Sequence, residues 1–181
     1  MLICTYSPLI FYLFMIIIVS GLPGSGKSYF AKKLSEHLSA QYLSSDKVRK
    51  DLRGANYNTE DKLQVYEHMA HLAAIVISKK QDLVLDATFY LKSVRGLFYK
   101  LAHKHQIPCL LIYITADDDI IKERVSKPRS DSDADYGVYL KIREEFEPIS
   151  RPHLVLKSTN YNISIMVDKA VQYIEENYDR R

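Results

Sequence analysis

The sequence predicts an α/β fold in which helices cover a parallel sheet. Short apolar runs alternate with longer segments whose apolar residues recur at helical spacing, as in successive β-α units. The composition is that of a globular protein, with 47% hydrophobic and 26% charged residues, which excludes disorder and low complexity. A length of 181 residues suits a single domain with a sizeable core.

The N-terminal half is predicted to form two strands and the helices that follow them. Ile16–Ser20 is apolar and rich in β-branched residues, which is typical of a buried strand. A helix is predicted over Lys27–Ala40, a short strand over Tyr42–Ser45, and a second helix from about Asp46. In Glu60–Lys80, apolar residues at helical spacing predict a long helix.

The C-terminal half repeats this alternation. A strand is predicted over Leu83–Leu85, ending at Asp86, and the segment Asp117–Ser126 begins with acidic residues, as helices commonly do. The remaining predicted elements are a helix, two strands and a last helix, at Leu91–Gln106, Cys109–Ile114, Leu154–Leu156 and Ile163–Tyr178 respectively. Such sheets have right-handed crossovers and bind ligands at the carboxyl ends of their strands. The candidate residues below follow such ends.

The first charged residue is Lys27, so the chain begins with a long uncharged segment. Leu9–Val19 is an apolar run that falls short of the roughly 20 residues needed to span a membrane, and no signal-peptide pattern precedes it. We expect residues 1–14 to be an apolar extension or an upstream translation start, with an extra strand, a packing arm or a membrane anchor as alternatives. Residues 15–181 are then one domain, expected to be cytoplasmic without a membrane partner. A net charge of +3 is too small to indicate a nucleic-acid-binding protein by itself. The two cysteines, Cys4 and Cys109, are too few for a disulfide framework.

One motif identifies a phosphate-binding loop. The segment from Gly21 to Ser28 matches G-x-x-x-x-G-K-[ST] without departure, between a predicted strand and a predicted helix. Its glycines let backbone N–H groups turn toward phosphate oxygens, Lys27 reaches the β- and γ-phosphates, and Ser28 ligates Mg²⁺. The nucleotide-binding residues predicted for ATP are Gly21, Leu22, Pro23, Gly24, Ser25, Gly26, Lys27, Ser28 and Tyr29. The motif and the five predicted strands indicate the P-loop NTPase fold, with a three-layer α/β/α arrangement and a five-stranded, mostly parallel sheet, and a small helical lid is expected as in small P-loop kinases.

Asp46 and Arg49 follow the second predicted strand and share a helix face because they are three residues apart. A carboxylate there can accept the proton of an acceptor hydroxyl, and an arginine can hold an acceptor or a transferring oxygen. The alternative is a purely structural role, in which Ser45 or Asp46 caps the helix and the Arg49 side chain is exposed to solvent.

These segments resemble a known family. GLPGSGKS, SSDKVRKDL and LVLDATF, followed by an arginine-bearing segment, resemble the small P-loop "predicted kinases", or AAA-like ATP-binding proteins. This group is related to polynucleotide kinase and to the zeta-toxin and chloramphenicol phosphotransferase kinases. The resemblance extends from about Met15 to the last helix. It implies that Asp46 is a general base and that Arg49 is an acceptor-site arginine.

Two further regions complete the candidate site. Asp86, at the end of the third strand, is expected to hold Mg²⁺ through water or to orient the acceptor, or alternatively to cap the next helix. The segment from Ile121 to Asp135 is predicted to leave a helix at Pro128 and form a polar lid. The resemblance implies that Arg124 is the first lid arginine. Arg129 is the second candidate, although its spacing of five residues departs from the family's four.

These observations predict an ATP-dependent phosphotransferase that moves the γ-phosphoryl group to a hydroxyl acceptor. A base such as Asp46 favours a hydroxyl, because a phosphate acceptor is already ionised. The acceptor is left open between a small molecule and the 5′-hydroxyl end of a nucleic acid, and so is the oligomeric state. The alternative is a module that binds or hydrolyses ATP and acts on a partner or nucleic acid.

Overall fold

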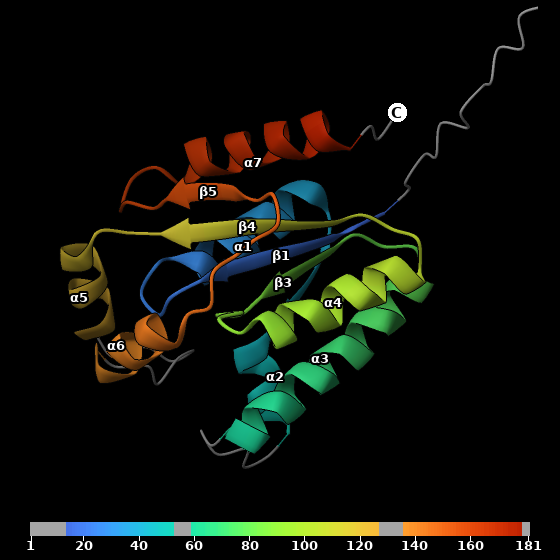
Figure 1. Ribbon diagram of the computed structural model, residues 1–181. Coiled ribbons are helices and arrows are strands. Elements are labelled where there is room, and N and C mark those ends of the chain that lie inside the picture. The colour runs from blue at the N-terminus through green and yellow to red at the C-terminus, as the bar shows by residue number, and fades with distance from the viewer. Residues whose placement is uncertain (1–13, 53–58, 127–135, 179–181) are drawn as a thin grey trace, which may run out of the picture.

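A computed structural model describes residues 14–52, 59–126 and 136–178 (Figure 1). Its sheet has five strands in the order β2-β3-β1-β4-β5, and every pair of neighbours is parallel. This confirms the predicted α/β class. The strands in chain order are β1 Ile16–Gly21, β2 Gln41–Ser44, β3 Leu83–Asp86, β4 Cys109–Thr115 and β5 Leu154–Lys157.

The central strand β1 separates two hydrophobic cores. Successive side chains of a strand point to opposite faces, so Ile16 and Ile18 enter one core while Ile17 and Val19 enter the other. All four side chains are completely buried, which explains why this stretch carries no charge. The position of β1 between β3 and β4 places its carboxyl end, where the phosphate loop starts, in the middle of the sheet.

Helices cover both faces of the sheet, as a three-layer arrangement requires (Figure 1). Helices α1 and α7 pack together with one core, and α2, α3 and α4 pack with the other. Two more helices, α5 and α6, lie beyond the carboxyl ends of the strands. The helices are α1 Lys27–Leu38, α2 Ser45–Asp51, α3 Thr59–Ser78, α4 Lys92–Lys104, α5 Asp118–Ser126, α6 Tyr136–Glu145 and α7 Ile163–Asn177.

Helices α5 and α6 form a separate small cluster at the predicted lid. Ile121 and Val125 of α5 pack on Tyr139 of α6, and Leu22 of the phosphate loop packs against them. A small helical lid was predicted, but no element was predicted over residues 136–145, so α6 itself was not anticipated. Lys127 to Asp135, which includes Arg129, lies outside the described residues.

Several boundaries differ by one or two residues from the sequence-based expectations, and the differences around α1 and α2 have clear physical reasons. The second helix was expected to be capped by Ser45 or Asp46, but Ser44 is the cap, because its hydroxyl accepts a hydrogen bond from the backbone N–H of Asp46. Ser45 is therefore helical rather than the end of β2. Helix α1 ends before Ser39, whose left-handed backbone lets its N–H bond back to the last turn.

The segment before β1 is described only from Phe14 onward. Phe14 packs against one core and Met15 is buried in the other, and the backbone N–H of Met15 donates to Asp82. None of the described helices combines the length and the apolar character that crossing a lipid bilayer requires.

Candidate active site

The phosphate loop, residues 21–28, connects β1 to α1 and depends on its glycines. Gly24 and Gly26 have φ angles of +80° and +88°, which are strained for any residue with a Cβ. A Cβ on Gly21 would lie 2.6 Å from the carbonyl oxygen of Ile114 in β4, so this position also excludes a side chain. Gly26 is the N-cap of α1, and as a glycine it provides no side chain to cap the N–H groups of the first turn. The loop thus has the backbone curvature and helix N-terminus that a phosphate site requires.

Asp86 lies beside this loop in a buried position. The parallel register places Asp86 next to Val19 of β1 and Ser44 of β2, and its side chain is only 1% exposed. Burial raises the pKa of its carboxyl group, and the charge of Lys27 and the nearby hydroxyls of Tyr42 and Ser28 oppose that rise. Asp86 is therefore close to both residues that the motif assigns to the phosphates and the metal.

The two oxygens of Asp86 have different surroundings. Oδ2 accepts a 2.6 Å hydrogen bond from the Tyr42 hydroxyl. Oδ1 is buried and has no hydrogen-bond partner within the described residues. A buried carboxylate oxygen without a hydrogen-bond partner, close to a serine hydroxyl, is suited to coordinate a hard cation or to accept a hydrogen bond from water bound to that cation. The chemistry of Ser28 and Asp86 thus suits a magnesium ion, and their role as its ligands stays a prediction.

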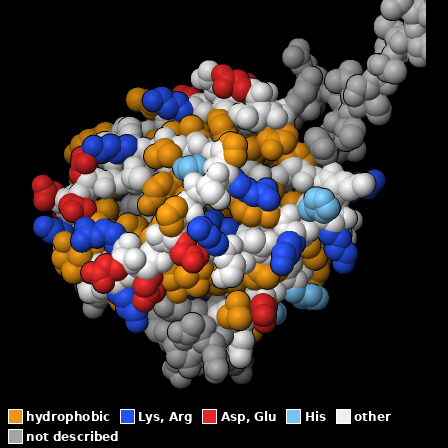
Figure 2. All heavy atoms as spheres, viewed as in Figure 1, with side chains coloured by type: hydrophobic (Ala, Val, Ile, Leu, Met, Phe, Trp, Pro, Cys, Tyr) orange, Lys and Arg blue, Asp and Glu red, His pale blue; other side chains and the backbone are white. Residues whose placement is uncertain are grey.

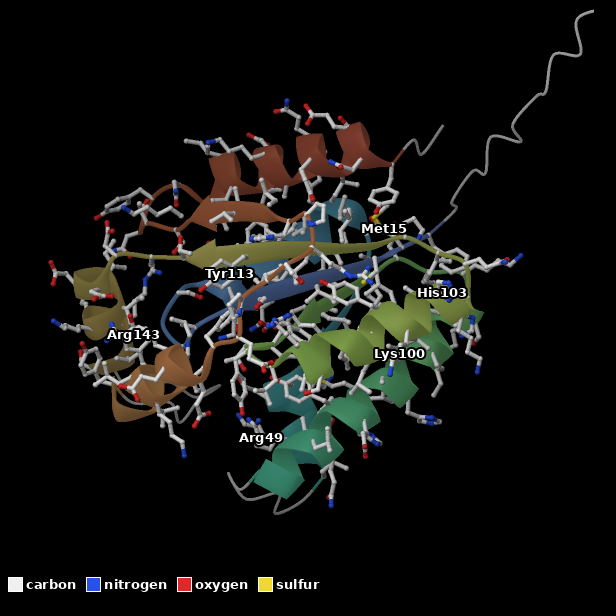
Figure 3. All side chains as sticks on the ribbon, in the orientation of Figure 1. Met15, Arg49, Lys100, His103, Tyr113 and Arg143 are labelled. Carbon is white, nitrogen blue, oxygen red and sulfur yellow. The ribbon has the colours of Figure 1, made fainter. Side chains whose placement is uncertain are left out.

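Asp46 and Arg49 form an ion pair on α2. The guanidinium Nη1 of Arg49 donates to Asp46 Oδ1 at 2.9 Å, and both side chains are partly buried. Figure 3 shows Arg49 projecting from α2. Burial is the main cause of the raised pKa of Asp86 and of Tyr42, and the charge of Asp46 adds a smaller rise to both, so Asp46 lies near the same edge of the sheet as the loop. The structure therefore brings the predicted carboxylate–arginine pair next to the predicted metal site.

A cavity of about 230 Å³ joins these elements between α1, β2 and α2. Its walls include the loop residue Ser28 and the carboxylate of Asp46. Three lysines also line it, one from α1 and two from α2. Lys32 was not anticipated, although its spacing of four residues from Ser28 places both on one helix face. The full lining is Ser28, Lys32, Tyr42, Ser44, Asp46, Lys47 and Lys50.

Arg124, the predicted lid arginine, lies against the phosphate loop. Its Nη1 donates to the carbonyl oxygen of Gly24 at 3.2 Å and to Ser158 Oγ at 2.7 Å, and Nη2 donates to Asn160 Oδ1 at 3.0 Å. Ser158 Oγ in turn donates to the carbonyl oxygen of Ser25 at 2.7 Å. Arg124 thus ties α5 to the loop and to the turn after β5, a contact that sequence spacing does not reveal. Tyr29, predicted with the loop, is 58% exposed on α1.

The parallel sheet covered by helices on both faces and the phosphate loop after its central strand place this chain among the P-loop α/β proteins. The AAA domain family matches residues 16–149, and the chain belongs to that family.

Several curated relatives are kinases. The chain is 24% identical over 182 residues to a protein of Aeropyrum pernix named "Probable adenylyl-sulfate kinase", covering 89% of this chain and 94% of that one. It is 29% identical over 111 residues to the adenylyl-sulfate kinase of Myxococcus xanthus, covering 59% and 60% of the two chains. The APS kinase of Mycobacterium tuberculosis, solved with AMPPNP and APS, has the same fold, with a TM-score of 0.69, 20% identity, and coverage of 90% and 98%.

Proposed function

We propose that this protein is an ATP-dependent phosphotransferase that transfers the γ-phosphoryl group to a hydroxyl acceptor. The observation that carries the proposal is that Asp46 and Ser28 line one cavity, next to a complete phosphate loop. The Asp46 carboxylate pairs with Arg49 and lines the same cavity as Ser28, so it is suited to accept the proton of an attacking hydroxyl. The naming of several relatives as kinases supports the same reaction class.

In this proposal the loop N–H groups and Lys27 hold the phosphates of ATP, and Tyr29, Leu22 and Pro23 belong to the same nucleotide site. Arg124 lies directly against the loop, because a Cβ placed on Gly26 would be only 3.0 Å from its Nη1. From this position it stabilises the loop and the charge on the transferring group. Ser28 and the unpartnered Oδ1 of Asp86 would hold Mg²⁺, directly or through water. When bound, the cation neutralises charge on the β- and γ-phosphates.

Asp86→Asn is expected to weaken binding of Mg²⁺–ATP by about 10- to 100-fold, the range typical when a group that supports a metal is lost. Binding of ATP with the metal chelated should change much less, because the loop and Lys27 are intact. Calorimetric titration with and without Mg²⁺ measures both. Equal losses under the two conditions would contradict a role for Asp86 at the metal.

Measuring the free energy of unfolding over a range of pH shows whether Asp86→Asn still folds and how Asp86 affects stability. In the protein free of metal and nucleotide, the raised pKa of Asp86 means that protonation stabilises the fold. That stabilisation is complete below the ordinary carboxyl value of 3.8 and is lost as the pH rises through the raised pKa. Urea unfolding over a pH series should show this change in the free energy of unfolding for the wild type, and Asp86→Asn should lack it.

The lysines in the cavity beside Asp46 favour an acceptor that carries negative charge. Lys32, Lys47 and Lys50 contribute three positive charges to its walls against one carboxylate. An acceptor with a phosphate or another anionic group would gain attraction there, and a neutral sugar would not. This preference applies equally to a phosphorylated small molecule and to a nucleic acid end.

Lys32→Gln combined with Lys47→Gln is expected to raise the KM for an anionic acceptor by about tenfold or more, since each exposed contact contributes on the order of 1 kcal/mol. The KM for ATP should stay within about twofold, because neither lysine belongs to the phosphate loop. Lys33→Gln is the matched control, since Lys33 lies on α1, pairs with Glu36 and does not line the cavity. Steady-state kinetics at two ionic strengths would show the difference, and an equal effect of Lys33→Gln would contradict the assignment.

The acceptor itself can be found with ATP labelled in the γ-phosphoryl group. The panel should pair each neutral alcohol with a phosphorylated counterpart, and include oligonucleotides with 5′-hydroxyl ends. Label in one anionic acceptor, with free phosphate as a minor product, is the expected result. Steady release of phosphate with no labelled acceptor would instead favour an ATP-hydrolysing module.

A further inference from the structure

A second cavity, of about 160 Å³, lies between α4 and the segment that leads from α6 to β5. We refer to residues 146–153 of that segment as the strap, and Figure 1 shows it crossing in front of β1 and β4. The cavity is lined by Lys92, Arg95, Tyr99, Ile149, Ser150 and Arg151. None of these residues belongs to the candidate active site.

The lining of this cavity has three cationic side chains and no acidic one. Lys92, Arg95 and Tyr99 are three and then four residues apart, so they form one stripe along α4. Arg151 comes from the strap and faces this stripe, with its guanidinium carbon 4.2 Å from the centre of the Tyr99 ring. Figure 2 shows basic side chains among apolar and uncharged ones over this part of the surface.

Arg95 is a buried cation whose hydrogen-bond partners are uncharged. Its side chain is 3% exposed; Nη1 donates to the carbonyl oxygen of Phe89 at 2.6 Å, and Nη2 donates to those of Glu147 and Pro148 at 2.9 and 3.0 Å. The carboxylate of Glu147 accepts instead from the backbone N–H of Lys92, at the start of α4. Arg95 therefore anchors the strap. It has no anionic partner among the described hydrogen bonds and ion pairs, although the Glu147 carboxylate is near enough for its charge to raise the pKa of Arg95 against the lowering by burial.

Tyr99 adds an unused donor. Its hydroxyl oxygen is buried and has no hydrogen-bond partner in the described part of the chain. Burial raises the pKa of Tyr99 to about 12, although the charges of Arg151 and Arg95 act against that rise, so both guanidinium groups lie near the hydroxyl. At neutral pH the group is a protonated donor, and a buried donor without an acceptor is costly.

We propose that this cavity binds a phosphate-type oxyanion, at a site separate from the phosphate loop. Lys92, Arg151 and the Tyr99 hydroxyl would donate to it, and the charge of Arg95 would be balanced by it. The ligand can be free phosphate or sulfate, or the phosphate group of a metabolite. Because Arg151 belongs to the strap, the bound anion would also fasten the strap to α4.

The test measures uptake of labelled inorganic phosphate by equilibrium dialysis, on protein saturated with Mg²⁺–AMPPNP so that the phosphate loop is occupied. The wild type should take up phosphate to saturation at about one site per chain. Arg151→Gln and Tyr99→Phe should each weaken it about tenfold or more, as expected for losing a hydrogen bond to a charged group. Lys100→Gln, an exposed position on the same helix, should have no effect.

Competition identifies the source of the anion. Displacement of the label by a sugar phosphate at lower concentration than by unlabelled phosphate would indicate a metabolite, and the reverse order would indicate the free ion. Circular dichroism confirms that the variants fold. The proposal is overturned if the nucleotide-saturated wild type takes up no phosphate to saturation, or if Arg151→Gln and Tyr99→Phe take it up as the wild type does.

Discussion

Lys27→Ala is expected to abolish transfer, with a loss of at least about 10³-fold in kcat/KM for ATP. Lys27 is the first residue of α1, and its charge opposes the rise that burial causes in the pKa of Asp86, so its ammonium group lies near the carboxylate that we propose supports the metal. Removing it takes away a charge that stabilises both bound ATP and the transferring group. Nucleotide titration and initial rates of transfer measure the two losses separately.

Lys33→Ala is the control for this prediction. Lys33 lies on the same helix, is exposed and pairs with Glu36, so its loss removes a positive charge away from the loop. Its rate should stay within about twofold of the wild type, as for most surface substitutions. If Lys27→Ala turned over nearly as fast as Lys33→Ala, the loop would not be the site of the reaction.

Asp46→Asn is expected to lower the transfer rate by about 10²- to 10⁴-fold while ATP affinity stays within about twofold. The amide keeps the shape of the carboxylate and can still accept from Arg49, but it cannot take a proton from a hydroxyl. Asp46 is not part of the phosphate loop, so nucleotide binding should persist. Single-turnover transfer and nucleotide titration distinguish these effects.

Asp51→Asn is the matched control, since Asp51 is an exposed carboxylate at the other end of α2. It should have nearly normal rates. Near-normal turnover of Asp46→Asn would show that the base is elsewhere. A fall in ATP affinity equal to the fall in rate would instead assign Asp46 to nucleotide binding.

The fold was largely predictable because its signals are local. A run of β-branched residues in Ile16–Ser20, followed by a glycine loop and an amphipathic helix, has few alternatives in a globular chain. The Asp46–Arg49 pair was predictable for the same reason, because two residues three apart on a helix must share a face. These signals lie in residues that are close in the sequence, although the strand and the helices are stabilised by packing against the rest of the chain.

The features that were missed depend on distant contacts. Helix α6 lies beyond a polar stretch, and its buried Tyr139 packs on α5. Three consecutive residues, Ser44, Ser45 and Asp46, can all cap a helix, so the pattern alone did not select Ser44. The bonds of Arg124 to Ser158 and Asn160 join residues more than 30 positions apart, and no local pattern indicates them.

The central claim is that a base beside the phosphate loop directs the γ-phosphoryl group to a hydroxyl. It is tested most directly by following label from γ-labelled ATP in a single turnover, in the presence of the acceptor found in the panel. We predict that the wild type places the label on the acceptor and that Asp46→Asn binds ATP but leaves it intact or releases free phosphate slowly. Label reaching the acceptor at the wild-type rate in Asp46→Asn, or only free phosphate in the wild type with every acceptor, would contradict the claim.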